Sequence, residues 1–157
     1  MTGMEILEVG LDSLDLRYGR LRARRPGAER RLLASLGEAG QQSPVIVVPG
    51  AEAGSFVLIE GRKRVRALKR MGADVVKAAV WAMPAGEALV AAYQMQQGAG
   101  WNALEEGWLV WELTREGELS LGEVERRLDR SKGWASRRLG LVESLPDAAA
   151  AGVQKGR

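Results

Sequence analysis

The stretch 56–71 constrains the fold of this chain more than any other. It opens on an apolar run, Phe-Val-Leu-Ile, of the kind that forms a buried strand, and Gly61 soon follows. The period of apolar residues then changes, because Val65, Leu68 and Met71 recur at three-residue steps, as on one face of a helix. The stretch therefore predicts a strand, a glycine turn and a helix.

The helix expected after Gly61 is basic from its start. Lysine and arginine recur from Arg62 to Arg70 without an acid between them, and cations in the first turn of a helix oppose its dipole. A glycine turn, the backbone N–H groups of a helix start and the side chains of Arg62, Lys63 and Arg64 together suit an anion. The alternative is a solvated basic face without a ligand, and these residues by themselves leave both interpretations open.

The absence of cysteine and histidine removes several kinds of chemistry. Disulfides, zinc–thiolate sites and cysteine nucleophiles are excluded, as are Ser-His-Asp catalysis and histidine-bound metals. The 157 residues suffice for one domain or two small ones. The chain holds no uncharged apolar run long enough to span a membrane and no signal-peptide pattern at its start, so we expect a cytoplasmic protein.

The basic residues of the chain are mostly arginine. The net charge is only +3, yet the isoelectric point is about 9.6. The planar guanidinium fork suits phosphate, which favours nucleic acid or a nucleotide as the partner. A high-GC codon usage produces the same bias, so composition does not decide the matter.

Residues 1–84 predict a small mixed domain of strands and helices. A basic loop begins at Arg17, a helix follows from about residue 26 and ends before Gly40, and the basic helix ends before Gly72. Four short apolar runs predict strands, at residues 4–9, 44–48, 55–60 and 75–81. This alternation indicates an α/β or α+β domain.

After Pro84 the pattern predicts helices alone. Asn102 suits the N-cap of one of them, and Ser120 with Glu123 has the capping-box pattern at the start of another. We expect the helices at residues 85–97, 103–116, 120–128 and 132–142. An aromatic stripe at helical spacing predicts packing between them, and it consists of Trp101, Leu104, Trp108 and Trp111.

Residues 119–142 have the pattern of a helix-turn-helix, two short helices with a brief turn and a second helix that we expect Ser131 to cap. DNA would be met near the start of the second helix. The candidate DNA contacts are Ser131, Lys132, Gly133, Trp134, Ser136, Arg137 and Arg138. An ordinary helical hairpin is the alternative.

Together these segments resemble the N-terminal and central DNA-binding parts of ParB-family partition proteins, from about residue 5 to the end. The most specific match, Gly61-Arg62-Lys63-Arg64-Val65-Arg66-Ala67, agrees with the family's Gly-Glu-Arg-Arg-x-Arg-Ala at all but two positions. The stretch 42–47 is similar to the family's Gln-Pro-Ile-x-Val with one residue shifted, and 101–106 is similar to its Leu-Asn-Pro-Leu-Glu-Glu. The helix-turn-helix and the trailing Leu145-Pro146 match as well.

The resemblance implies a ParB/sulfiredoxin-like α+β architecture, with a mixed α/β domain over residues 1–84 and an all-α helix-turn-helix domain over 85–157. In that family the first domain binds CTP with magnesium and closes as a clamp on DNA. This implies a homodimer with a partner ATPase in plasmid or chromosome partition, associated with the nucleoid or a plasmid, or an accessory factor in transposition. The implied nucleotide site consists of Gly61, Arg62, Lys63, Arg64, Arg66, Gln42, Ser43 and Arg20.

Two departures from the family pattern concern the nucleotide site. Arg62 stands where the family has glutamate. The family's Glu-Asn-x-x-Arg, which grips triphosphate and metal, falls on Gln94-Met95-Gln96-Gln97-Gly98, which lacks the acid, the amide ligand and the arginine. Because magnesium needs hard oxygen ligands, these departures argue against metal-dependent CTP hydrolysis.

The chain also breaks off soon after Pro146, where a helix begins, so we expect the natural protein to be longer.

The leading hypothesis is a sequence-specific DNA-binding protein, and the alternative is an enzyme. Some ParB-like domains are nucleases or nucleotide-dependent kinases, and such chemistry needs clustered carboxylates. The acids that flank the basic helix, Glu60 and Asp74, have no paired acid in the sequence. Sulfiredoxins share the first fold but rely on a cysteine, which this chain lacks.

Overall fold

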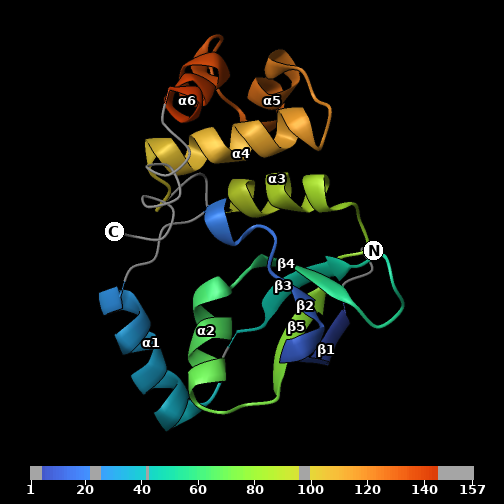
Figure 1. Ribbon diagram of the computed structural model, residues 1–157, viewed down its shortest axis with the longest axis vertical. Coiled ribbons are helices and arrows are strands. Elements are labelled where there is room, and N and C mark those ends of the chain that lie inside the picture. Colours follow the sequence, from blue (N-terminus) through green and yellow to red (C-terminus); the bar gives the residue numbers. More distant parts are fainter. Residues whose placement is uncertain (1–4, 22–25, 42, 96–99, 145–157) are drawn as a thin grey trace. The chain divides into compact units, whose positions relative to one another are not determined.

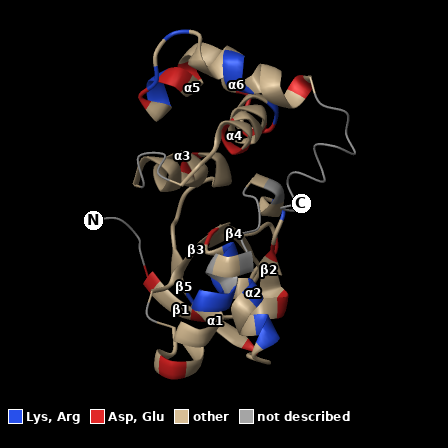
Figure 2. Ribbon diagram, turned by 90° about the vertical axis from the view of Figure 1, so that its left-hand side faces the viewer, with Lys and Arg blue, Asp and Glu red and all other residues tan. Residues whose placement is uncertain are grey.

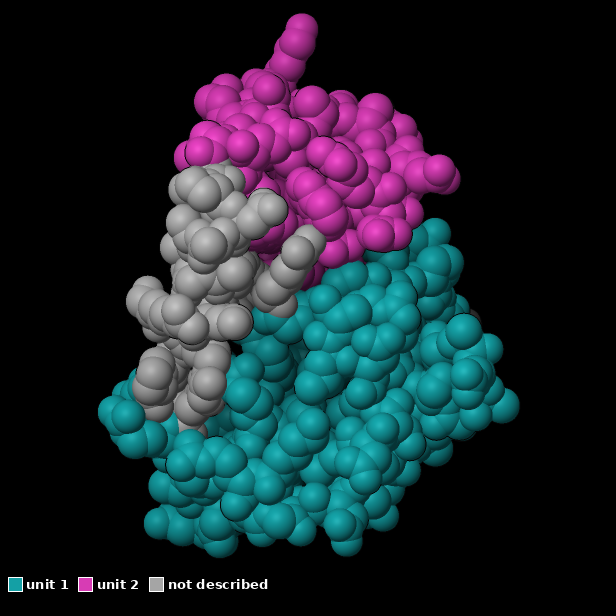
Figure 3. Space-filling view, viewed as in Figure 1, with its two compact units in different colours: residues 1–19, 25–88 teal, residues 20–24, 89–157 magenta. Residues whose placement is uncertain are grey.

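The structure is a computed structural model that describes residues 5–21, 26–41, 43–95 and 100–144. The chain forms two compact units, one of residues 1–19 and 25–88 and the other of residues 20–24 and 89–157 (Figure 3). The predicted domain ranges, 1–84 and 85–157, resemble this division and stay a prediction. In the described part, no helix is both long enough and apolar enough to cross a membrane.

The first unit is built on a mixed five-stranded sheet in the order β1-β5-β3-β4-β2 (Figure 1). The antiparallel pairs are β1 with β5 and β3 with β4, and the parallel pairs are β3 with β5 and β2 with β4. The strands are β1 (Glu5–Gly10), β2 (Leu14–Asp15), β3 (Val45–Pro49), β4 (Phe56–Glu60) and β5 (Val75–Val80). The predicted α+β class is confirmed, and β2 is a strand that the sequence pattern did not predict.

Two helices, α1 (Pro26–Ala39) and α2 (Arg62–Arg70), cover one face of this sheet (Figure 1). Their apolar stripes meet the strands in a buried core that includes Leu36, Val45 and Val65. The residue Met71 was predicted on the same stripe, but it is 45% exposed because α2 ends one residue earlier.

Strand β3 is buried on both faces of the sheet. Val45 and Val47 face the α1–α2 layer, whereas Val48 packs on the opposite face with Val57 and Ala88. Such two-sided burial explains why the run at residues 44–48 is continuously apolar instead of alternating. Two short 3-10 turns, Leu11–Ser13 and Gly19–Leu21, lie in the segment before α1.

Among the described residues, four helices follow the sheet: α3 (Ala85–Met95), α4 (Ala103–Arg115), α5 (Leu121–Leu128) and α6 (Trp134–Glu143). The N-cap predicted at Asn102 and the capping box predicted at Ser120 are both present, and Asn102 forms a capping box as well, with Glu105. The predicted start of α6 is wrong, because Gly133, and not Ser131, is its N-cap, in a left-handed conformation with φ of +89°. The last two residues of the helix predicted at 85–97 lie outside the described residues.

Helix α4 and helix α6 approach each other closely at Gly107. A Cβ atom added there would lie 2.5 Å from the backbone oxygen of Arg138 and 2.9 Å from Cγ2 of Val142. The obstacle is largely backbone, which cannot turn aside as a flexible side chain can. The crossing therefore requires a residue without a side chain.

Replacing Gly107 with alanine should lower the free energy of unfolding by about 1–3 kcal/mol, the usual cost of overpacking. The matched control is Gly140→Ala in the interior of α6, where nothing lies within 4 Å of an added Cβ. That control should raise stability by about 0.5–1 kcal/mol through helix propensity alone. Urea unfolding followed by tryptophan fluorescence measures both values. Equal, stabilising effects would contradict the close crossing.

Candidate functional site

The turn between β4 and α2 is held open by a glycine. Gly61 has φ of +113°, and a Cβ atom added to it would lie 2.5 Å from Cγ1 of Val45. The residue therefore has two reasons to be glycine, one conformational and one steric. No side-chain hydrogen bond caps α2 at Gly61, and no acid lies in the first turn. The positive end of the helix dipole thus coincides with three basic residues, which makes this helix start electropositive.

Arg64 connects this turn to the two residues that precede β3. Its guanidinium donates to the backbone oxygens of Ser43 and Pro44 at 2.8 and 2.9 Å, and it forms an ion pair with Glu60 at 2.9 Å. The side chain is only 18% exposed. The structure thus brings Arg64 and Ser43 together, as predicted. Most N–H groups of the Arg64 guanidinium, however, donate to other residues of the protein.

The other residues of the predicted nucleotide site differ in their exposure. Arg62 is half-buried beside Gly19, where an added Cβ would lie 3.7 Å from Cδ of Arg62. Lys63 is exposed and Arg66 is half-buried further along α2. Gln42 and the side chain of Arg20 lie outside what the structure describes. Lys and Arg recur along α2 and on α6 (Figure 2).

The turn between α5 and α6, residues 129–133, is defined by two left-handed residues and one buried carboxylate. Asp129 has φ of +57° and Gly133 has φ of +89°. Glu125, which is 9% exposed, accepts a hydrogen bond of 2.9 Å from the backbone N–H of Ala135. The start of α6 is therefore capped by a side chain from α5 and not by Ser131.

The predicted DNA contacts fall into two groups. Exposed positions on the turn and on the first turns of α6 are Ser131, Lys132, Ser136 and Arg137, with Gly133 half-buried. Trp134 is 5% exposed, so its ring belongs to the core and its predicted DNA contact is not compatible with this burial. The guanidinium of Arg137 lies beside Gly133, where an added Cβ would be 2.8 Å from Nη1.

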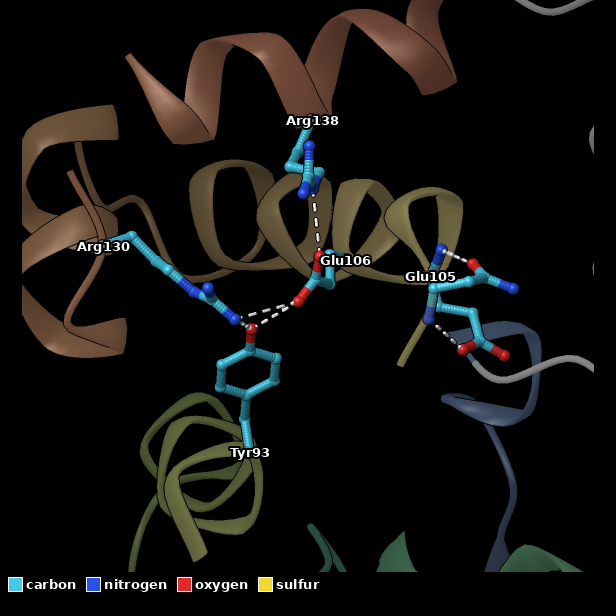
Figure 4. A network of polar contacts seen from close by, with 6 residues as sticks. Tyr93, Glu105, Glu106, Arg130 and Arg138 are labelled. Atoms are coloured by element: carbon cyan, nitrogen blue, oxygen red, sulfur yellow. Dashed lines mark hydrogen bonds and ion pairs between the residues drawn. The ribbon is translucent and has the colours of Figure 1, made fainter. Parts of the chain in front are cut away.

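Arg138 belongs to a second group, centred on the buried carboxylate of Glu106 (Figure 4). One carboxylate oxygen accepts from Nε of Arg138 at 3.0 Å. The other accepts from the hydroxyl of Tyr93 and from Nη2 of Arg130 at 3.2 Å, and Arg130 also donates to the Tyr93 hydroxyl. The guanidinium groups of Arg130 and Arg138 lie 5.0 and 5.4 Å from the ring centroid of Trp134.

Sequence reasoning did not identify this cluster. The local signal was a pair of acids, Glu105 and Glu106, in the first turn of an otherwise apolar helix face. Glu105 closes the capping box with Asn102, which leaves Glu106 as a buried acid that needs distant partners. Gln94, which stands in the segment aligned with the family's triphosphate grip, donates to the backbone oxygen of Arg127 near the end of α5.

The cluster changes the acidity of Tyr93. Burial, followed by the hydrogen bond to Glu106, raises the pKa of the Tyr93 hydroxyl to about 12. Because the folded pKa lies above the ordinary value of about 10, the associated stability is present below pH 10 and is lost as the pH rises toward 12. In a Tyr18→Phe chain, which keeps Tyr93 as its one tyrosine, ultraviolet titration should give a midpoint about two units above that of free tyrosine. A midpoint near 10 would contradict this burial.

The acids of the described residues do not gather into a metal site: no group of three or more His, Cys, Asp or Glu side chains is placed to hold an ion there.

Comparison with known proteins bears on the fold. The family model of the ParB N-terminal domain matches residues 2–96. None of the curated proteins matches the chain.

Solved structures that share the architecture include the following three. The C-terminally truncated chromosome-partitioning protein ParB from Caulobacter crescentus, complexed with CTP-gamma-S, is 22% identical with a TM-score of 0.52 and covers 96% of this chain and 92% of that chain. The same protein complexed to the centromeric parS site is 21% identical, with a TM-score of 0.50 and coverages of 91% and 74%. The Pnob8-like ParB-N domain is 14% identical, with a TM-score of 0.61 and coverages of 98% and 69%. At these identities the similarity establishes the fold.

Proposed function

Because the chain belongs to the ParB N-terminal domain family, we propose that it is a ParB-like, sequence-specific DNA-binding protein. In this proposal α6 reads the DNA as the second helix of a helix-turn-helix, and the start of α2 binds the triphosphate of CTP. The protein acts as a homodimer with a partner ATPase in the partition of a plasmid or chromosome, or as an accessory factor of a mobile element.

The observation that carries the proposal is the division of α6 into two faces. Trp134, Ala135 and Val142 are buried, whereas Ser136 and Arg137 are exposed. The exposed side chains near the helix start combine a hydroxyl with a guanidinium, which suits base edges and phosphates in a major groove. A ParB with the same fold was solved in complex with parS DNA, which supports the DNA-binding part of the proposal.

Replacing Arg137 with alanine tests the reading role. If Arg137 contacts a guanine, the change should cost about 1–3 kcal/mol of binding and relax selectivity at one base position. The matched control is Arg115→Ala, an exposed arginine at the end of α4. Fluorescence anisotropy with duplexes enriched by in vitro selection measures both. An equal loss on every sequence would instead identify Arg137 as a phosphate contact, and no loss would remove it from the interface.

The nucleotide arm rests on the start of α2. The Gly61 turn, the helix dipole and Lys63 provide an anion site, and a ParB of the same fold was solved with CTP-gamma-S. Calorimetric titration with CTP, with and without magnesium, should show binding that Lys63→Ala weakens. Lys69→Ala, an exposed lysine in the last turn of the same helix, should leave the affinity unchanged. The absence of any heat of binding would remove the nucleotide arm and leave the DNA arm standing.

A further inference from the structure

One buried carboxylate connects four segments of the second unit, residues 20–24 and 89–157 (the helical unit). Glu106 is 5% exposed in the first turn of α4, and its partners are Tyr93 on α3, Arg130 in the turn before α6, and Arg138 on α6. One negative group thus holds two positive groups and a hydroxyl (Figure 4). A buried carboxylate with three donors has its hydrogen-bonding capacity largely satisfied.

The two arginines are held on two sides each. Besides their bonds to Glu106, both guanidinium groups lie over the ring of Trp134, and the Arg130 and Arg138 side chains are only 33% and 29% exposed. A guanidinium bonded to a buried carboxylate and placed over an indole loses most of its rotamer freedom. Arg138 directly follows Arg137 in α6, so the contacts that hold the Arg138 side chain also restrain the backbone at Arg137.

Helix α6 is therefore fixed at two points by acids from other helices. Glu125 of α5 holds its first turn through the N–H of Ala135 at 2.9 Å, and Glu106 of α4 holds its second turn through Arg138 at 3.0 Å. The close approach of α4 at Gly107 sets the distance between α4 and α6, whereas hydrogen bonds weaken steeply when the donor–hydrogen–acceptor angle departs from linear. The two polar contacts therefore add a restraint on the rotation of α6 about its own axis, which sets the direction of its exposed side chains.

We propose that Glu106 is a positioning residue for DNA reading: it fixes the angle at which α6 presents Ser136 and Arg137, and Arg130 and Arg138 are its counterions and not DNA contacts. This inference rests on the proposed function, because it concerns the same DNA-reading surface. It assigns sequence selectivity in part to a residue that DNA does not touch. Base-reading side chains need placement to within a fraction of an ångström, which such supporting contacts supply.

The test measures selectivity as a ratio, so that loss of folded protein cancels. The full chain and its Glu106→Gln and Arg138→Met variants are titrated with the duplex enriched by selection and with a duplex of permuted sequence, over a range of salt concentrations. The matched control is Glu116→Gln, an exposed acid just after α4. Glutamine keeps the size of Glu106, but removes its charge and turns an amide N–H₂ toward an arginine.

The expected result is that Glu106→Gln lowers the ratio of the two affinities by about tenfold or more, the order of one lost base contact. Arg138→Met should lower it similarly without changing the salt dependence, the double variant should lose no more than either single one, and Glu116→Gln should match the parent chain. A parent-like ratio for Glu106→Gln would overturn the inference. So would a salt slope reduced by about one in Arg138→Met, since Arg138 would then contact a phosphate. A parent chain without any preference overturns the proposed function, and this inference with it.

Discussion

Replacing Gly61 with alanine should lower the free energy of unfolding of the first unit, residues 1–19 and 25–88, by about 3 kcal/mol or more. Two costs add. A residue with a side chain is strained at φ of +113°, and its Cβ would lie 2.5 Å from Cγ1 and 2.8 Å from Cβ of Val45. Val45 is fully buried in β3 and has no room to move away. Chemical unfolding followed by far-ultraviolet circular dichroism measures the loss.

The matched control for Gly61 is Gly72, at the end of the same helix region. Its φ is also positive, at +78°, but nothing lies within 4 Å of an added Cβ. Gly72→Ala should therefore cost only the conformational strain, about 1–2 kcal/mol. Equal losses at the two glycines would show that the approach to Val45 contributes nothing, and would contradict the geometry of the candidate anion site.

Replacing Glu106 with leucine should destabilise the helical unit by about 2–4 kcal/mol. Removal of one partner from a buried ion pair typically costs about 3–5 kcal/mol, and the partial exposure of Arg130 and Arg138 reduces that figure. Tryptophan fluorescence during urea unfolding is a suitable measurement, because the helical unit holds Trp101, Trp108, Trp111 and Trp134.

A second variant separates the unpaired charges from the lost packing. When Arg130 and Arg138 are also replaced by methionine, no cation is left without its carboxylate, so the triple variant should be more stable than Glu106→Leu alone. A triple variant less stable than the single one would show that the arginines stabilise the unit independently of Glu106. A single variant as stable as the parent chain would contradict the central place of Glu106 in the cluster.

The strands and helices that the sequence predicted share a local origin. Runs such as 44–48 and the period change after Gly61 are visible within a few residues, and the capping boxes at Asn102 and Ser120 join positions three residues apart. Strand β2 escaped prediction because two residues carry no period. It exists only through its pairing with β4, in which Leu14 lies opposite Phe56.

The site was harder to predict because its decisive contacts are distant in sequence. Glu106 meets Arg130 and Arg138 across turns that no local spacing encodes, and the cap of α6 comes from Glu125. Trp134 was assigned to the DNA face because it stands near the start of the second helix of the predicted helix-turn-helix, where DNA would be met. In the structure the guanidinium of Arg138 lies over the ring of Trp134 on the same face of α6. The arginine can lie there because Glu106 neutralises its charge.

The measurement that tests the central claim most directly is the affinity of the 157-residue chain for two duplexes at one salt concentration. One duplex is enriched by in vitro selection with this chain, and the other has the same composition in permuted order. We predict that the enriched duplex binds about a thousandfold more tightly or better, as specific DNA-binding proteins do. Equal affinities at every salt concentration would mean that only phosphates are recognised, and would contradict sequence reading by α6.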